Sequence, residues 1–184
     1  MQVSQPFFGL YILEPTVYQD DRGYFYESYN FDKLSAQGLA VAFIQDNHTF
    51  SKKGVLRGLH FQLPPKGMGK LVRCTSGKIW DVAVDLRVDS ITYKHWFGIE
   101  LSGENKRQLY LPPGFAHGFY TIEDAEVLYK CTATFSKELE GAVIWNDPEL
   151  KINWPVTDHS VPLLSQKDQE APLLAQLNLP AKWE

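Results

Sequence analysis

The chain has 184 residues, with 18 basic and 22 acidic side chains and a net charge of −4. The length predicts one domain over residues 1–184, and the acidic balance argues against binding nucleic acid or an anionic membrane. Cys74 and Cys131 form no CxxC pattern, which predicts two reduced, buried thiols. Without a signal-peptide pattern or a long apolar run, the chain is expected to be soluble and cytoplasmic.

The N-terminal part contains short aromatic and apolar runs that are separated by turn residues. Residues 7–13 and 23–29 are predicted to be strands, with the turn sequence DDRG at 20–23 between them. A short helix is predicted over residues 31–37, ending at Gly38.

The central part continues the strand pattern. At residues 80–86, apolar side chains alternate with Asp81, Ala83 and Asp85, which predicts a strand with one buried face. Residues 76–78, Ser-Gly-Lys, predict a turn before it. Further strands are predicted over residues 92–101, 107–111, 118–122, 126–135 and 141–144.

Near the C-terminus, either Ser165 or Asp168 could cap a second helix that contains Leu173, Leu174 and Leu177. Closely spaced strands with so little helix predict an all-β jelly roll, or a related sandwich, with short peripheral helices.

Two histidines raise the hypothesis of a metal site. A jelly-roll metal site usually offers two histidines one residue apart, then a glutamate and a later histidine. Gln62 stands two residues after His60, so His60, Gln62 and His117 make a poor ligand set for zinc or iron. We therefore expect no metal. The other histidines are interpreted as surface or hydrogen-bonded residues: His48, His95 and His159.

His60 is better suited to acid–base chemistry. An imidazole has an ordinary pKa of about 6.5 and can accept a proton near neutrality if a carboxylate fixes its tautomer. Removing a proton beside a carbonyl also requires a cation for the enolate oxygen, and Lys70 is the candidate. Inversion at carbon needs an acid on the opposite face. Tyr129 could serve, but it is one of nine tyrosines and spacing alone does not select it.

Long motifs follow one another in order along nearly the whole chain. They are DRGYFYES (21–28), QDNH (45–48), VLRGLHFQ (55–62), GKLVR (69–73), DVAVDLR (81–87), ENKRQ (104–108), PGFAHGF (113–119), LYK (128–130), WND (145–147) and SQKD (165–168). Together they closely resemble the dTDP-4-dehydrorhamnose 3,5-epimerases.

The resemblance implies a cofactor-free, cupin-like double-stranded β-helix that acts as a homodimer in dTDP-L-rhamnose biosynthesis. The enzyme would convert dTDP-4-dehydro-6-deoxy-D-glucose to dTDP-4-dehydro-L-rhamnose by epimerising C3 and C5, which both flank the C4 ketone. His60 would be the base and Asp168 its orienting partner. Lys70 would stabilise the C4 enolate, and Tyr129 would return a proton from the opposite face.

The resemblance also implies a set of residues that hold the dTDP-sugar. They are Arg22, Glu27, Gln45, Asp46, Asn47, Arg57, Lys70, His117, Glu140 and Lys167. By analogy, Arg22 and Glu27 are expected to serve the site of the partner subunit. Phe135 stands where the family usually has a tyrosine that stacks on thymine, and its ring keeps the face that stacking needs.

Three other functions remain open. A mono-epimerase acting at C3 or C5 alone would share the base and the acid. A metal-dependent cupin would need ligands that Gln62 does not supply. A sugar-nucleotide-binding module could lack the base, the orienting carboxylate or the acid, whereas His60, Asp168 and Tyr129 are all present.

Overall fold

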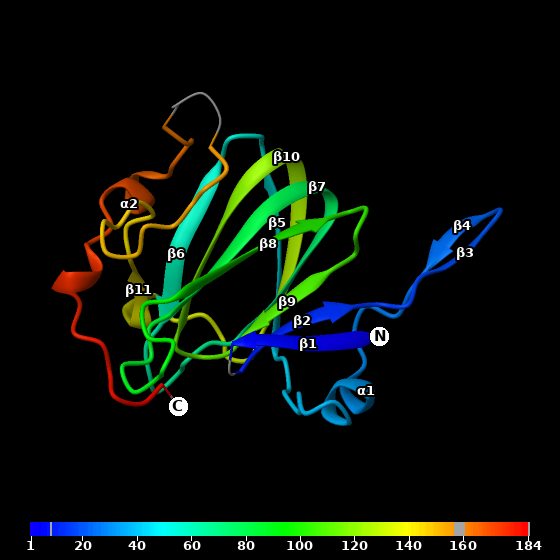
Figure 1. Cartoon of the computed structure of the whole chain (residues 1–184), viewed down its shortest axis with the longest axis horizontal. Helices are drawn as coiled ribbons and strands as arrows, with labels where there is room; N and C mark the ends of the chain where they lie inside the picture. The colour runs from blue at the N-terminus through cyan, green and yellow to red at the C-terminus, as the bar shows by residue number, and fades with distance from the viewer. Residues whose placement is uncertain (8, 157–160, 184) are drawn as a thin grey trace.

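The computed structural model describes residues 1–7, 9–156 and 161–183, and antiparallel strands dominate it (Figure 1). The strands are β1 (Gln2–Phe7), β2 (Leu10–Glu14), β3 (Tyr18–Asp20), β4 (Gly23–Phe25), β5 (Gln45–Ser51), β6 (Leu56–Gln62), β7 (Lys70–Asp85), β8 (Trp96–Ser102), β9 (Gln108–Leu111), β10 (Phe115–Cys131) and β11 (Glu140–Ala142). The helical elements are α1 (Phe31–Ser35), α2 (Gln166–Gln169) and the 3-10 helices Lys137–Leu139 and Leu174–Gln176. The predicted all-β fold with short helices is confirmed. No helix among these residues is long and apolar enough to span a membrane.

Two long strands, β7 with 16 residues and β10 with 17, form the spine of the fold. They pair along their length, from Phe115 opposite Asp85 to Cys131 opposite Lys70. The first half of β7 also pairs with β9, and the second half of β10 pairs with β5. The other two halves pair with β8 and β6. Each long strand thus has different neighbours along its two halves, and the nine-stranded sheet rolls up around an interior.

The predicted turn at residues 76–78 is wrong, because β7 continues through it. Gly77 has φ +72°, and a Cβ there would lie 1.9 Å from the carbonyl oxygen of Asp124. The register between β7 and β10 shifts between Glu123 and Glu126. An irregularity of the β-bulge type in the β7–β10 pairing therefore accommodates the glycine and its polar neighbours.

Other predicted boundaries also move. The predicted strands 118–122 and 126–135 are parts of one strand, β10, which ends at Cys131. The strand predicted over 92–101 begins only at Trp96, because the preceding residues form turns. Strands at 107–111 and 141–144 are present as β9 and β11, shifted by one or two residues.

The second half of β7 is buried on both faces, so the prediction of one buried face is wrong. Val82 and Val84 pack in an apolar cluster with residues of the C-terminal segment, including Trp154. Ala83, on the opposite face, packs in a second cluster. Asp81 and Asp85 are on that face too, and both are fully buried. Since the sheet rolls up, the face carrying the aspartates becomes its interior.

The first two predicted strands are shorter than expected. Residues 7–13 do not form one strand, because the chain reverses at Gly9, with φ +85°, and β1 pairs with β2; Phe8 lies outside the described residues. Of residues 23–29, only β4 is a strand, after a turn at residues 21–22. Figure 1 shows the β3–β4 hairpin standing away from the body, where it lacks the sheet neighbours that would extend it.

Both predicted helices form, but they are short. Asn30 caps α1 by accepting a hydrogen bond from the Lys33 amide, and the helix ends at Ser35, before Gly38. Ser165 caps α2, so the alternative cap at Asp168 is wrong. The second helix ends before Leu173, because the chain extends there.

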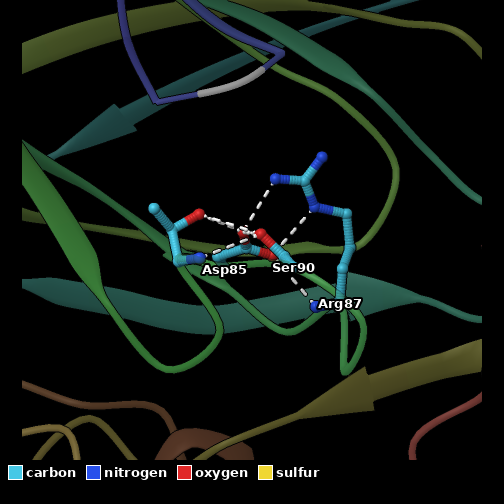
Figure 2. A network of polar contacts seen from close by, with 4 residues as sticks. Asp85, Arg87 and Ser90 are labelled. Atoms are coloured by element: carbon cyan, nitrogen blue, oxygen red, sulfur yellow. Dashed lines mark hydrogen bonds and ion pairs between the residues drawn. The ribbon is translucent and has the colours of Figure 1, made fainter.

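Asp85 ends β7 in a network of hydrogen bonds (Figure 2). Arg87 Nε and Nη2 donate to its two oxygens at 2.8 and 2.7 Å. The hydroxyls of Ser90 and Thr92 each donate to Oδ2 at 2.6 Å. Burial would raise the pKa of Asp85, but these donors hold it below its ordinary value. Both oxygens are satisfied, so this buried carboxylate is structural.

Candidate active site

The interior of the roll contains two adjoining cavities of about 490 and 290 Å³. His60, Lys70 and Tyr129 line both of them, so the two cavities form one cleft with these side chains at its junction. The cleft therefore brings together the proposed base, cation and acid, which are up to 69 positions apart in the sequence.

Strand β5 lines one wall through strict alternation. Gln45, Asn47 and Thr49 face the cleft, whereas Asp46, His48 and Phe50 are exposed on the outer face. The Asp46 carboxylate accepts from Lys130 Nζ at 2.9 Å on that outer face. The side chain of Asp46 is thus turned away from the cleft of its own chain.

The bulge in β7 decides which of its residues face the cleft. Side chains of a regular strand alternate, so Cys74 and Ile79, five positions apart, would lie on opposite faces. Both pack in the same interior cluster, because the irregularity at Gly77 shifts the alternation by one. As a result, Lys70 and Asp81 face the same interior.

His60 forms a short hydrogen bond with a buried carboxylate. Its Nε2 lies 2.5 Å from Asp168 Oδ1, and the two side chains are 27% and 4% exposed. Ser165, the cap of α2, donates from Oγ to Asp168 Oδ2 at 2.8 Å. Burial would raise the pKa of Asp168, but the bonds from His60 and Ser165 hold it below its ordinary value. The carboxylate therefore stays ionised and orients the imidazole.

The C-terminal segment reaches His60 through β6. Leu163 forms an isolated parallel bridge with Val55, and the Leu56 amide donates to the Leu163 carbonyl at 3.0 Å. This pairing places α2, and with it Asp168, beside β6, 108 positions away in sequence from His60.

Lys70 is partly buried beside Tyr129, with its Nζ 6.0 Å from the centre of the tyrosine ring. Within the described part of the chain, the ammonium makes no hydrogen bond or ion pair. Burial lowers the pKa of Lys70 and raises the pKa of Tyr129. A partly buried cation without a direct partner is available to an anion that enters the cleft, and a protonated phenol is available as an acid.

Gln62 lines the smaller cavity and forms hydrogen bonds with two neighbouring loops. Its Nε2 donates to the carbonyls of Lys66 and Thr134 at 2.6 and 3.2 Å, and its Oε1 accepts from the Ser136 amide at 2.9 Å. Phe135, on the same loop, is 53% exposed at the cavity wall. From the sequence, Gln62 is notable only as a poor metal ligand; in the structure, its side-chain amide holds the loop that carries Phe135.

Two more of the expected residues line the cleft, and a third, Lys167, is paired with one of them. Arg57 lines the larger cavity and donates from Nε to Ser51 Oγ at 2.9 Å. Glu140 lines the smaller cavity and forms an ion pair with Lys167.

Arg22 and Glu27, like Asp46, are not brought to this cleft. Arg22 pairs with Asp20 at 2.7 Å on the projecting hairpin. Glu27 pairs with Lys33 at 2.6 Å beside α1. Neither lines the cleft within one chain.

The other histidines and the two cysteines differ in their surroundings. His117 lies in the cleft and its Nε2 bonds Asp81 at 2.9 Å. His48 is exposed and bonds Glu126 at 3.0 Å; His95 is exposed; His159 lies outside the described residues. Cys74 and Cys131 are free and buried, as predicted.

Known proteins share this sequence and fold. A family model described as dTDP-4-dehydrorhamnose 3,5-epimerase matches residues 4–176. The protein of that name from Salmonella typhimurium is 54% identical over 169 residues, 90% of each chain. The solved dTDP-6-deoxy-D-glucose-3,5-epimerase from Legionella pneumophila, in complex with dTDP-4-keto-L-rhamnose, is 44% identical with a TM-score of 0.91, covering 96% of this chain and 94% of that one. The epimerase from Bacillus anthracis, with TDP and PPi bound, is 47% identical with a TM-score of 0.90, covering 94% and 99%.

The rolled sheet and its interior cleft therefore define an isomerase with a cupin-like jelly roll. The sequence identity to these relatives, over nearly the full length of the chain, narrows this class to one family. The chain belongs to the dTDP-4-dehydrorhamnose 3,5-epimerase family, as its motifs predicted.

Proposed function

We propose that this chain epimerises dTDP-4-dehydro-6-deoxy-D-glucose at C3 and C5, giving dTDP-4-dehydro-L-rhamnose. The observation that carries the proposal is the His60–Asp168 pair, 2.5 Å apart, in one cleft with Lys70. A base beside a partly buried cation suits removal of a proton next to a ketone. Relatives named as 3,5-epimerases favour the double reaction over a mono-epimerase.

The C4 ketone explains how one site can serve two carbons. C3 and C5 both flank the carbonyl, so deprotonation at either carbon gives an enolate with its charge on the same oxygen. His60 would remove each proton in turn. Lys70 would donate a hydrogen bond to the C4 oxygen, and Tyr129 would protonate the carbon from the other side. No cofactor enters this sequence of steps.

The substrate-holding roles follow from the positions in the cleft and beside it, where Lys167 pairs with Glu140. Arg57 and Lys167 supply cations for the diphosphate, since a guanidinium pairs well with phosphate oxygens. Gln45 accepts from the Phe135 amide at 2.9 Å, so β5 and the Phe135 loop form one wall. We assign the thymine to that wall, with the Phe135 ring stacked on it.

We further propose a homodimer in which the β3–β4 hairpin reaches the partner's cleft. The hairpin carries Arg22, and its Tyr18, Tyr24 and Phe25 side chains are 64, 57 and 69% exposed. Such apolar exposure on a projecting arm is typical of an interface. Glu27, which follows β4, would contribute to the same partner cleft.

Complementation between two inactive variants tests this exchange. Arg22→Ala and His60→Ala are each expected to be inactive as homodimers. Coexpressed, half of the dimers would be mixed, and each would hold one complete cleft, so activity should return to about a quarter of wild type. Unmixed variants at the same concentration are the control. A mixed dimer that forms without regaining activity would show that the arm does not serve the partner's site.

The reaction itself is tested by the configuration of the product. After incubation with dTDP-4-dehydro-6-deoxyglucose, proton NMR couplings around the ring should show inversion at both C3 and C5. Tyr129→Phe should keep exchanging protons with solvent but invert much more slowly, because the base remains and the opposing acid is lost. Inversion at a single carbon would support the mono-epimerase. A Tyr129→Phe variant that inverts at the wild-type rate would remove the tyrosine from the mechanism.

A further inference from the structure

Asp81 forms a hydrogen bond with a second histidine of the cleft, His117. None of the roles proposed above involves Asp81. Its Oδ2 accepts from His117 Nε2 at 2.9 Å, and the two side chains are 0% and 7% exposed. His117 on β10 lies opposite His60 on β6 and opposite Ala83 on β7. The Asp81–His117 pair therefore forms a wall of the same cleft as the His60–Asp168 pair.

Asp81 and Asp85 lie on the same face of β7 but differ in their surroundings. Both oxygens of Asp85 accept hydrogen bonds from Arg87, and Oδ2 also accepts from Ser90 and Thr92. Asp81 Oδ1 is buried and has no hydrogen-bond partner among the described residues. A buried carboxylate oxygen left bare is unusual and points to a role beyond stability.

The titratable groups that face Lys70 come from five elements. They are Arg57 and His60 of β6, Asp81 of β7, His117, Tyr129 and Cys131 of β10, Glu140 of β11, and Lys167 and Asp168 of α2.

Most of the acidic groups near Lys70 are either neutral or already paired. Burial raises the pKa of both Cys131 and Tyr129, so neither is an anion near neutral pH. Glu140 forms an ion pair with Lys167, and Asp168 is paired with His60. Within the described part of the chain, Asp81 is thus the carboxylate near Lys70 that has no cationic partner.

The hydrogen bond to Asp81 also fixes the state of His117. Burial lowers the pKa of His117 and outweighs the raising effect of Asp81, and the positive charge of Lys70 lowers this pKa further, so the imidazole is neutral. With its proton on Nε2, donated to Asp81, the ring presents Nδ1 as an acceptor. That atom has no partner among the described residues.

We infer that Asp81 is a positioning residue: its negative charge keeps Lys70 protonated in the buried cleft, and its hydrogen bond presents His117 Nδ1 as an acceptor. The inference rests on the proposed role of Lys70, which must be cationic to stabilise an enolate. Asp81 acts through these two residues and does not need to touch the substrate.

The charge of Lys70 can be titrated directly, without substrate. On protein carrying 13C-labelled lysine, the Lys70 signal is assigned by its loss in Lys70→Arg. In Asp81→Asn the Lys70 titration midpoint should fall by roughly one unit or more. Asp85→Asn is the matched control, and it should lower the unfolding temperature while leaving that midpoint unchanged. An unchanged Lys70 midpoint in folded Asp81→Asn would overturn the inference.

Kinetics separate this inference from the proposed reaction. In Asp81→Asn the alkaline limb of kcat should move to lower pH by the same amount as the Lys70 midpoint, with little change in KM. If wild type shows no epimerase activity while the midpoint still falls, the proposed reaction fails and the inference about Asp81 stands.

If Asp81→Asn does not fold, the inference can be tested on the wild-type protein by measuring the protonation of His117. With 15N-labelled histidine, His117 should show a protonated Nε2 and a bare Nδ1 throughout the neutral range. A proton on Nδ1, or a charged ring near neutral pH, would overturn the inference.

Discussion

Replacing His60 with alanine is expected to lower kcat by about 10²–10⁴-fold while the dTDP-sugar still binds. The imidazole is the group that Asp168 orients, and it lines both parts of the cleft. Alanine leaves Asp168 without its donor and puts no base in the position of the ring. Steady-state rates together with calorimetric titration of dTDP separate the loss of chemistry from a loss of binding.

His48→Ala is the matched control for that experiment. His48 also bonds a carboxylate, Glu126, at 3.0 Å, but it lies on the exposed face of β5. Its removal should leave kcat unchanged. Wild-type activity in His60→Ala would eliminate His60 as the base.

Replacing Lys70 with methionine is expected to lower kcat by about 10²–10³-fold, the usual effect of removing one donor to a developing oxyanion. Methionine keeps an apolar side chain of similar length and removes only the charge. Because burial lowers the pKa of Lys70, wild-type activity should fall on the alkaline side as the ammonium loses its proton. The activity is present below that pKa and lost above it. Lys70→Met should lack this alkaline limb.

Lys70→Arg tests the charge separately from the shape. An arginine stays protonated at every accessible pH, so the alkaline limb should disappear while more activity remains than in Lys70→Met. Tyr129 does not obscure this limb, since burial raises its pKa. If Lys70→Met and wild type share the same kcat and the same pH profile, the enolate does not depend on Lys70.

The motifs in the sequence were sufficient to predict the family, because they are long and follow one another in order. The alternation at residues 80–86 correctly predicted a strand. Strand β5 was missed for a physical reason. Its inward residues, Gln45, Asn47 and Thr49, line a polar cleft, and its outward residues include Asp46 and His48. Neither face shows the apolar period by which strands are recognised.

The grouping of Lys70 with Asp81 could not be read from spacing. Eleven positions separate them, an odd number that places them on opposite faces of a regular strand. The bulge at Gly77 reverses the alternation and puts both in the interior. A glycine in a predicted turn gave no sign that the strand would continue through it.

The burial of Asp81 and Asp85 could not be predicted from the sequence either. Alternation assigned both to a solvent face, because charged residues rarely lie inside without partners. The partners come from elsewhere: Arg87 and Thr92 from the loop after β7, and His117 from β10. Such contacts form only when the sheet rolls up.

Isotope exchange at each carbon tests most directly whether one base serves both positions. Wild type and His60→Ala are incubated with dTDP-4-dehydro-6-deoxyglucose in deuterated water, and the C3 and C5 protons are followed by NMR. Wild type should incorporate deuterium at both carbons, and His60→Ala, with substrate bound, at neither. Exchange that persists at either carbon in His60→Ala would contradict the single-base account.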